Sequence, residues 1–227
     1  MILNPPLANL SASAYAPCSA FSGSCREMRW NPSQGHVPRG FLGAAGALSE
    51  VELVLVFAEP GDPHESETHE GLTSAYRYAT YAFETGKDQF RRNVRTILDS
   101  CWPGLSFVDQ MKKVWMTESV LCSATKEGGS VSVAAASECG RRYLAKQLEL
   151  LPHALVVALG SKAQKRLRSI GFTKFLPAFA VAPPWCNFFR AQESWDRISI
   201  ELHRMNEAQQ GTPTDVLAAA SRRKEGG

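Results

Sequence analysis

Two carboxylates and a histidine follow a short apolar segment of this chain. Glu59, Asp62 and His64 come directly after the run 51–57. Such a run predicts a strand buried on both faces of a parallel sheet, and α/β proteins bind ligands beyond the carboxyl ends of such strands. Carboxylates in that place can orient a water or stabilise a positive charge, and a histidine can carry a proton. The alternative is a polar turn that merely ends the strand.

The elements that would position these residues follow from apolar patterning. Four apolar runs predict buried strands at 51–57, 113–122, 153–159 and 175–181, the second ending near Glu118. Helical spacing of apolar residues is found at about 71–100, 134–151, 162–170 and 195–207. This alternation favours an α/β fold, a three-layer α/β/α sandwich with a central, mainly parallel sheet.

The rest of the chain has a different composition. Residues 1–49 are rich in Pro, Ser, Gly and Ala and predict an arm packed on the core, with one short helix near Glu27. Residues 50–207 form the expected α/β domain, and residues 208–227 predict a polar, disordered tail.

Bulk properties exclude few function classes. The 227 residues are 44% apolar and carry a formal charge of +3, which permits a local nucleic-acid-binding patch without requiring one. The sequence contains neither a run suited to a membrane helix nor a secretory signal. We therefore expect a cytoplasmic monomer whose six cysteines are free thiols or metal ligands.

Three segments, in this order, resemble the uracil-DNA glycosylase superfamily, particularly its bacterial iron–sulfur branches (families four and five). Ala58-Glu-Pro-Gly61 is similar to that family's Gly-Glu-Ala-Pro-Gly loop with one residue missing. Met116-Thr-Glu-Ser-Val-Leu-Cys122, with Cys139 opening a later helix, is similar to its strand ending in Thr-Asn-Val-Val-Lys-Cys. The third segment, 154–163, is similar to its apolar strand, Leu-Gly turn and helix.

The resemblance implies a monofunctional DNA N-glycosylase that flips a damaged or modified pyrimidine out of DNA and hydrolyses its glycosidic bond. The setting would be base-excision repair or defence against modified phage DNA. Glu59 matches the family's loop carboxylate and would stabilise the sugar cation. Asp62 is the second choice, because Asp62-Pro-His64 is similar to the Asp-Pro-Tyr-His loop of another branch.

The chain departs from the family where the base is recognised. Glu118 stands in place of the Asn that reads the uracil edge, and Ala182-Pro-Pro replaces a His-Pro-Ser loop. An ionised Glu only accepts hydrogen bonds, which suits the N4 amino group of cytosine. Ala182 would leave room for a bulky 5-substituent, so a modified cytosine is one expectation. The alternative is that Glu118 points away or stays protonated and uracil remains the substrate.

The resemblance also suggests a metal centre. Cys122 and Cys139 have a spacing close to that of two cluster ligands in the iron–sulfur branches, and Cys18 and Cys25 lie where the other two would come from. Four thiolates would hold a 4Fe–4S cluster. The alternative is four unrelated thiols, since cysteine is often a small buried apolar residue.

Two segments are candidates for holding DNA. Gly160 and Ser161 open a helix that continues with Lys162, an arrangement that can bind a phosphate. Trp185, Asn187 and Arg190 lie on an aromatic loop that could supply the wedge and the phosphate anchor of a base-flipping enzyme. The alternatives are a solvated helix face and a packed aromatic cluster.

Two other function classes stay open at this point. One is a catalytically inactive member of the superfamily that acts as a DNA-binding module. The other is a small-molecule α/β enzyme with a nucleotide in the same crevice, which the lack of a Gly-rich dinucleotide or phosphate-loop motif disfavours.

Overall fold

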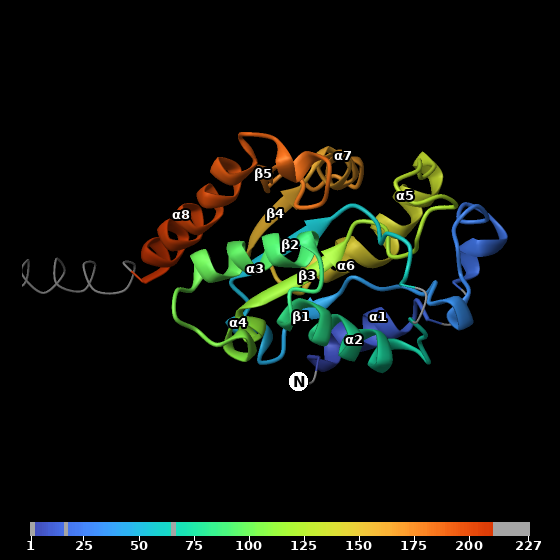
Figure 1. Cartoon of the computed structure of the whole chain (residues 1–227), viewed down its shortest axis with the longest axis horizontal. Helices are drawn as coiled ribbons and strands as arrows, with labels where there is room; N and C mark the ends of the chain where they lie inside the picture. Colours follow the sequence, from blue (N-terminus) through green and yellow to red (C-terminus); the bar gives the residue numbers. More distant parts are fainter. Residues whose placement is uncertain (1–2, 16–17, 65–66, 211–227) are drawn as a thin grey trace, which may run out of the picture.

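A computed structural model describes residues 3–15, 18–64 and 67–210 of the chain (Figure 1). The strands are β1 (Leu42–Gly43), β2 (Leu53–Phe57), β3 (Val114–Glu118), β4 (Leu155–Leu159) and β5 (Leu176–Ala178). The α-helices are α1 (Pro5–Ala12), α2 (Leu72–Glu84), α3 (Gln89–Cys101), α4 (Phe107–Lys113), α5 (Val133–Cys139), α6 (Ala145–Glu149), α7 (Ser161–Ser169) and α8 (Ala191–Gln210).

The strands form one sheet in the order β1-β3-β2-β4-β5. Strands β2 to β5 are parallel to their neighbours, and β1 pairs antiparallel with β3. The chain passes from β2 to β3 in one direction and then returns past β2 to β4, so the strand order reverses at β2. Ligand sites in open parallel sheets lie at such a reversal, beyond the carboxyl ends of the strands.

Helices cover both faces of this sheet. Right-handed crossovers in opposite directions place α2 and α3 on one face and α5, α6 and α7 on the other. Helix α3 packs against α8, and α7 packs against α5, in agreement with this division. All five residues of β2 and of β3 are buried, as a sheet covered on both sides requires. The α/β class with a mainly parallel sheet is confirmed, and the arrangement is compatible with three layers.

The segment expected to be an arm contributes to the sheet and to the core. It supplies β1 and helix α1, and Leu7 and Phe41 from it are at most 1% exposed. No α-helix forms near Glu27 among these described residues; a 3₁₀ turn at Ser19–Ser22 and further turns are found instead. A two-residue strand has too short a pattern to be recognised in a sequence.

Other boundaries also differ from expectation. The helical region expected at 71–100 is two helices, because the chain turns at Gly86, which has a left-handed φ of 61°. Helix α4 was not expected, and α8 begins four residues before the expected 195. Helix α8 continues to Gln210, and the remainder of the expected tail, 211–227, lies outside the described residues.

Gly43 provides a test of the β1–β3 pairing. Its φ is +103°, and a Cβ added there would lie 2.0 Å from the carbonyl oxygen of Val114. We expect Gly43→Ala to lower the free energy of unfolding by clearly more than the roughly 1–2 kcal/mol that a left-handed backbone alone costs a residue with a side chain. The matched control is Gly104→Ala, since Gly104 has a φ of +80° and open space around it. Equal losses in urea denaturation would contradict the close approach of β1 to β3.

Candidate functional site

Three residues singled out in the sequence meet at the carboxyl edge of the sheet. Glu118 is the last residue of β3 and pairs with Phe57, the last residue of β2. Glu59 follows two residues after Phe57, and Lys162 lies in the first turn of α7, just beyond β4. The structure therefore brings Glu59, Glu118 and Lys162 together from three adjacent strands, at the point where the strand order reverses.

Glu59 is held between two cations. Its side chain is 7% exposed, Lys162 Nζ donates a hydrogen bond to its Oε1, and Arg166 Nη1 lies 2.5 Å from its Oε2. Arg166 also donates to the carbonyl of Ala58 (2.7 Å) and to the hydroxyl of Ser119 (3.1 Å). Arg166 thus fixes the loops after β2 and β3 to α7, and Glu59 is oriented by both cations.

Arg166 was not among the site residues expected from the sequence. In the sequence it is one of the basic residues of the helix expected at 162–170, which could hold a phosphate or lie on a solvated face, and in the structure it is 8% exposed. The signal that could have identified it is its spacing of four from Lys162, because residues four apart share one helix face. The basic helix α7 therefore directs Lys162 and Arg166 toward Glu59, while Lys165 and Arg168 are exposed.

Glu118 is buried, and within residues 3–15, 18–64 and 67–210 it forms no ion pair. It is 5% exposed, and its Oε2 has no hydrogen-bond partner among the residues that the structure describes. Gly40 packs directly on it: a Cβ added at Gly40 would lie 2.5 Å from Cγ of Glu118. Only a residue without a side chain leaves room for the carboxyl group in this position.

This environment favours the neutral form of Glu118. Burial is the largest cause that raises the pKa of Glu118 to about 8, followed by the charge of Glu59; Arg166, Arg39 and Arg91 act in the opposite direction. The neutral acid therefore predominates at pH 7. Of the two alternatives stated for Glu118, the structure favours the protonated side chain, because the effect of burial and of Glu59 exceeds that of the three arginines.

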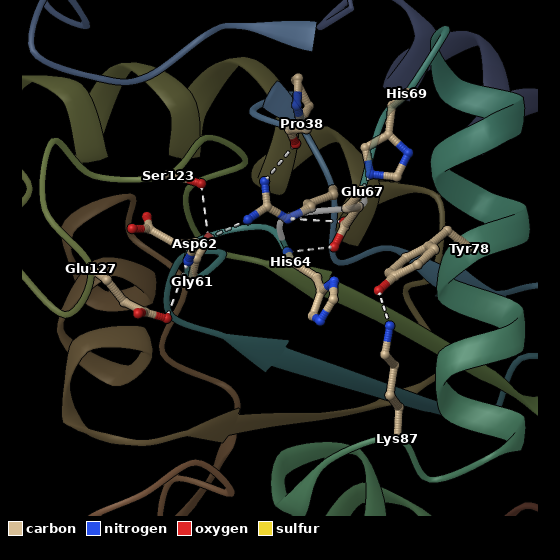
Figure 2. Close-up of polar contacts among 12 residues, drawn as sticks. Pro38, Gly61, Asp62, His64, Glu67, His69, Tyr78, Lys87, Ser123 and Glu127 are labelled. Atoms are coloured by element: carbon tan, nitrogen blue, oxygen red, sulfur yellow. Dashed lines mark hydrogen bonds and ion pairs between the residues drawn. The ribbon is translucent and has the colours of Figure 1, made fainter. Parts of the chain in front are cut away.

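Asp62 and His64 lie on the outer part of the same loop (Figure 2). The Asp62 side chain is 37% exposed and forms an ion pair of 2.8 Å with Arg29, and its backbone N–H donates to Glu127 (3.2 Å). His64 is exposed, and its backbone N–H donates to Glu67 (3.1 Å). Figure 2 shows the side chains of Asp62 and His64 pointing in different directions, so they do not form one group with each other.

A buried cluster that sequence reasoning missed fixes this loop from the other side. His69 Nε2 lies 2.8 Å from Oε1 of Glu67, and Arg39 Nε lies 3.8 Å from the same oxygen. Burial tends to raise the pKa of Glu67, but His69, the backbone N–H of His64 and Arg39 together bring it below its usual value. Arg39 also donates to the carbonyl of Gly61. The expected arm, which contains Arg39, thereby holds the loop that carries Glu59.

The four cysteines expected to hold a cluster converge on one cavity. Cys18, Cys25, Cys122 and Cys139 all line a cavity of about 20 Å³ between the N-terminal segment, the loop after β3 and helix α5. The remaining two cysteines, Cys101 and Cys186, do not line it. The fold therefore brings together the four cysteines that the resemblance implies as cluster ligands, although Cys18 and Cys139 lie more than one hundred positions apart in the sequence.

Donors directed at two of the sulfur atoms suit a thiolate-bound cluster. Arg142 and Tyr143 each donate to Cys18 Sγ at 3.4 Å, and the backbone N–H of Leu121 donates to Cys139 Sγ at 3.4 Å. Hydrogen bonds to sulfur are a common feature of iron–sulfur sites. Arg142 and Tyr143 lie in a π-helical turn, Gly140–Leu144, and such turns are frequent at functional sites.

The same cavity is not arranged for a single metal ion. Over the described ranges, no group of three or more Cys, His, Asp or Glu side chains is placed to hold one ion. Ligands of a cluster bind separate irons and lie farther apart than ligands of one ion. The residues fit a 4Fe–4S cluster in type and number, but at about 20 Å³ the side chains would have to move outward to admit it. Burial raises the pKa of Cys139 to about 12, so cluster binding must displace protons.

The loop after β5 exposes aromatic side chains. Trp185 and Phe189 are 63% and 77% exposed. The Phe189 ring nevertheless lies 4.6 Å from that of Phe188, which stacks on Phe179, so an aromatic cluster is present beside the exposed rings. Arg190 lies over the Phe189 ring, and Asn187 accepts a hydrogen bond from Gln89 of α3 (2.9 Å). Ala182 is half-buried at the start of this loop. None of the described helices is long and apolar enough to cross a membrane.

Gly160 makes the turn from β4 into α7. Its φ is +95°, a Cβ there would lie 3.0 Å from that of Ala180, and its N–H donates to the carbonyl of Ala178 (2.9 Å). Ser161 and Lys162 are exposed in the first turn of the helix. The predicted phosphate-binding turn is thus accessible, and it lies directly beside Glu59 through the Lys162 contact.

The protonation of Glu118 makes stability depend on pH. Because the folded state raises the pKa of Glu118 from about 4.5 to about 8, folding retains a proton that the unfolded chain releases. The wild type should therefore lose stability as pH rises from about 4.5 to 8, whereas Glu118→Gln does not titrate. Across this pH window, we expect the difference in free energy of unfolding between Glu118→Gln and the wild type to shift in favour of the variant by on the order of a few kcal/mol. Chemical denaturation at pH 5 and pH 8 measures the difference, and a constant difference would contradict a neutral Glu118.

No known family model matches the chain, and no curated protein is similar to it at a significant level. The resemblance to the uracil-DNA glycosylase superfamily thus stays a prediction from three short segments.

Proposed function

We propose that the chain is a DNA N-glycosylase that removes a damaged or modified pyrimidine from DNA. The observation that carries the proposal is the meeting of Glu59, oriented by Lys162 and Arg166, with the buried Glu118 at the carboxyl edge of the sheet. In this proposal Glu59 acts on the sugar and Glu118 contacts the base. The biological role that follows is base-excision repair or defence against modified phage DNA.

In the proposed reaction the bond between C1′ of the sugar and N1 of the base breaks, and its electron pair leaves with the base. The sugar becomes an oxocarbenium-like cation, as in glycoside hydrolysis. Glu59, held in a fixed orientation, stabilises that cation. A water adds its oxygen to C1′, and the proton that it loses is taken up by the departing base anion. The products are the free base and an abasic sugar.

DNA would be held by the groups around this edge. A phosphate is suited to the exposed first turn of α7, where helix N–H groups and Lys162 attract anions. Lys162 is 43% exposed, so it can exchange Glu59 for a phosphate when DNA arrives. Trp185 and Phe189 are suited to fill the gap left by a flipped nucleotide, with Arg190 as a phosphate anchor.

A 4Fe–4S cluster bound by Cys18, Cys25, Cys122 and Cys139 would have a structural role. Such a cluster supplies four strong metal–thiolate bonds. Those bonds would tie the N-terminal segment to the loop after β3 and to α5. The same segment carries Arg39 and Gly40, which contact the loop of Glu59 and the side chain of Glu118.

A second candidate function is a DNA-binding module without catalysis. The observation that favours it is that both oxygens of Glu59 already face cations, which reduces the negative charge available to a sugar cation. Binding of DNA with a steep salt dependence and no release of base would identify this function.

The deciding experiment is incubation of the purified protein with oligonucleotides that contain uracil or modified cytosines, in single-stranded and double-stranded form. Alkaline cleavage at abasic sites reports excision. Strand cleavage that depends on the modified base supports the proposal. Binding without cleavage on every substrate overturns it in favour of the non-catalytic module.

Glu59 can be tested by removing its charge alone. We expect Glu59→Gln to keep DNA binding and to lower the single-turnover excision rate by about a hundredfold or more, the scale of losing one electrostatic stabiliser. Glu70→Gln is the matched control, since Glu70 is exposed and lies outside the site. Unchanged excision by Glu59→Gln would move the role to Asp62, which Asp62→Asn then tests.

The cysteines can be tested without reference to catalysis. Protein purified without oxygen should be brown and contain about four irons per chain, as expected of a 4Fe–4S cluster. Cys122→Ala should lose the colour and iron and lower solubility, because the N-terminal segment is no longer tied down. Cys101→Ala is the control, since Cys101 is buried away from the cavity. Colourless, iron-free protein with full activity would contradict the presence of a 4Fe–4S cluster.

A further inference from the structure

An open groove lies in the N-terminal segment, outside the carboxyl edge of the sheet. Its volume is about 500 Å³, within the range of pockets that hold small ligands. The reaction proposed above uses none of the side chains that line it. We call it the Trp30 groove, and its lining residues are Arg29, Trp30, Asn31, Gln34 and His36.

Three of the lining residues belong to a tight hairpin, residues 31–36. Asn31 and His36 exchange two backbone hydrogen bonds, of 2.6 and 2.9 Å. Gly35 closes the turn with a left-handed φ of +72°, and a Cβ added there would lie 2.5 Å from the carbonyl oxygen of Glu67. The hairpin is therefore fixed by its own hydrogen bonds and packs on the loop that follows β2. A wall of this kind is formed before a ligand arrives, which lowers the cost of binding.

Arg29 connects the Trp30 groove to the loop of Glu59. Its Nη1 lies 2.8 Å from Oδ1 of Asp62, and its backbone N–H donates to the carbonyl of Ser123 (3.0 Å). Asp62 follows Glu59 by three residues, so their Cα atoms are at most about 11 Å apart. A ligand in the groove therefore lies beside the loop whose carboxylate would act on the sugar.

The Trp30 groove is polar but carries little net charge. Arg29 is the one charged side chain among the described residues that line it, and Asp62 neutralises it. Burial lowers the pKa of His36, and the charges of Arg29 and Arg39 lower it further against nearby carboxylates, so the imidazole is mainly neutral at pH 7. A cation would meet no carboxylate among these lining residues, and an anion would compete with Asp62 for one arginine. The groove therefore suits a neutral polar ligand.

The lining side chains all end in planar groups, namely a guanidinium, an indole, an imidazole and two amides. The half-buried ring of Trp30 can stack on a flat ligand. Asn31 and Gln34 are exposed, and Asn31 Nδ2 donates to Gln34 Oε1 (3.0 Å), which holds the two amides together. A flat ring with donors and acceptors on its edge suits this set, and proteins hold unpaired nucleobases in this way. A base inside a duplex offers neither a free face nor a free pairing edge.

We propose that the Trp30 groove binds an unpaired nucleobase of the DNA strand on which Glu59 acts. The inference rests on the function proposed above and names the form of its substrate, single-stranded DNA. The base stacks on Trp30 and offers its edge to Gln34, while the sugar of a nearby nucleotide reaches Glu59. Binding in the groove tolerates different bases, because every base has a flat face.

The test measures the affinity for fluorescent DNA by polarisation at one salt concentration. The probes are a thymine oligonucleotide and the same strand in a full duplex. We expect Trp30→Leu to weaken binding of the single strand about tenfold or more, the scale of one lost base–aromatic stack, and to change duplex binding by less than about twofold. Trp30→Phe keeps an aromatic face and should stay within about threefold of the wild type. Tyr81→Leu is the matched control, since Tyr81 is an exposed aromatic residue that does not line the groove.

A further probe separates the base from the phosphate. A tetrahydrofuran strand of the same length keeps every phosphate and lacks every base. Trp30→Leu should bind this strand as tightly as the wild type does. Gln34→Ala should weaken binding of the thymine strand severalfold and leave the abasic strand unaffected. Gln34 is exposed, so this variant tests the groove even where Trp30→Leu does not fold.

Three results overturn the inference. They are equal weakening of single strand and duplex, equal weakening of thymine and abasic strands, and wild-type affinity for the thymine strand in both folded variants. Thymidine monophosphate that binds as tightly as the strand also overturns it, because the groove then serves a free nucleotide. Where base release is observed, each of these results leaves the proposed function intact. The absence of both DNA binding and base release overturns the proposed function together with this inference.

Discussion

Glu59 and Glu118 are two carboxyl groups at one edge of a sheet, and the cations beside them ion-pair with only one of the two. The parallel register of β2 and β3 forces this proximity, because Phe57 pairs with Glu118 and the chain continues from Phe57 to Glu59. Lys162 and Arg166 neutralise Glu59, which leaves Glu118 to keep its proton. The division into one charged and one neutral carboxyl group is thus a consequence of strand pairing and of which residues α7 presents.

The N-terminal segment supports this division from the opposite side. Gly40 gives Glu118 the space in which it is buried, and Arg39 holds the loop of Glu59 through the carbonyl of Gly61. The same segment brings Cys18 and Cys25 to the cavity that Cys122 and Cys139 line. The carboxyl edge of the sheet and the cysteine cavity therefore both depend on the N-terminal segment, and displacement of that segment would affect both.

The sequence predicted those parts of the fold that depend on local pattern. The apolar runs of β2 and β4 identified buried parallel strands because both sheet faces are covered, and the alternation with helices identified the α/β class. The two-residue strand β1 and the contacts of Arg39 were missed, because they depend on partners outside the local sequence: Leu42 pairs with Met116, and Arg39 contacts Gly61, 22 residues away. No local pattern specifies such long-range packing.

The sequence predicted which residues form the candidate site better than it predicted their protonation states. Glu59, Glu118 and Lys162 were placed at strand ends, where the structure finds them. The protonation state of Glu118 could not be read from the sequence, since it depends on burial and on the count of nearby cations. The contact of Arg166 with Glu59 was not predicted, because the sequence shows a run of basic helical residues but not which of them becomes buried.

The antiparallel pairing of β1 with β3 also bears on the order in which the chain can fold during synthesis. Leu42 leaves the ribosome more than seventy residues before its partner Met116, and Cys25 more than one hundred residues before Cys139. The first fifth of the chain therefore cannot complete its packing until most of the domain has been synthesised, and Phe41 and Leu42 stay unburied until then. Contacts of such long sequence separation form late, because loop closure must precede them. Apolar segments that wait in this way are binding sites for chaperones, and the N-terminal segment is where we expect this chain to need them.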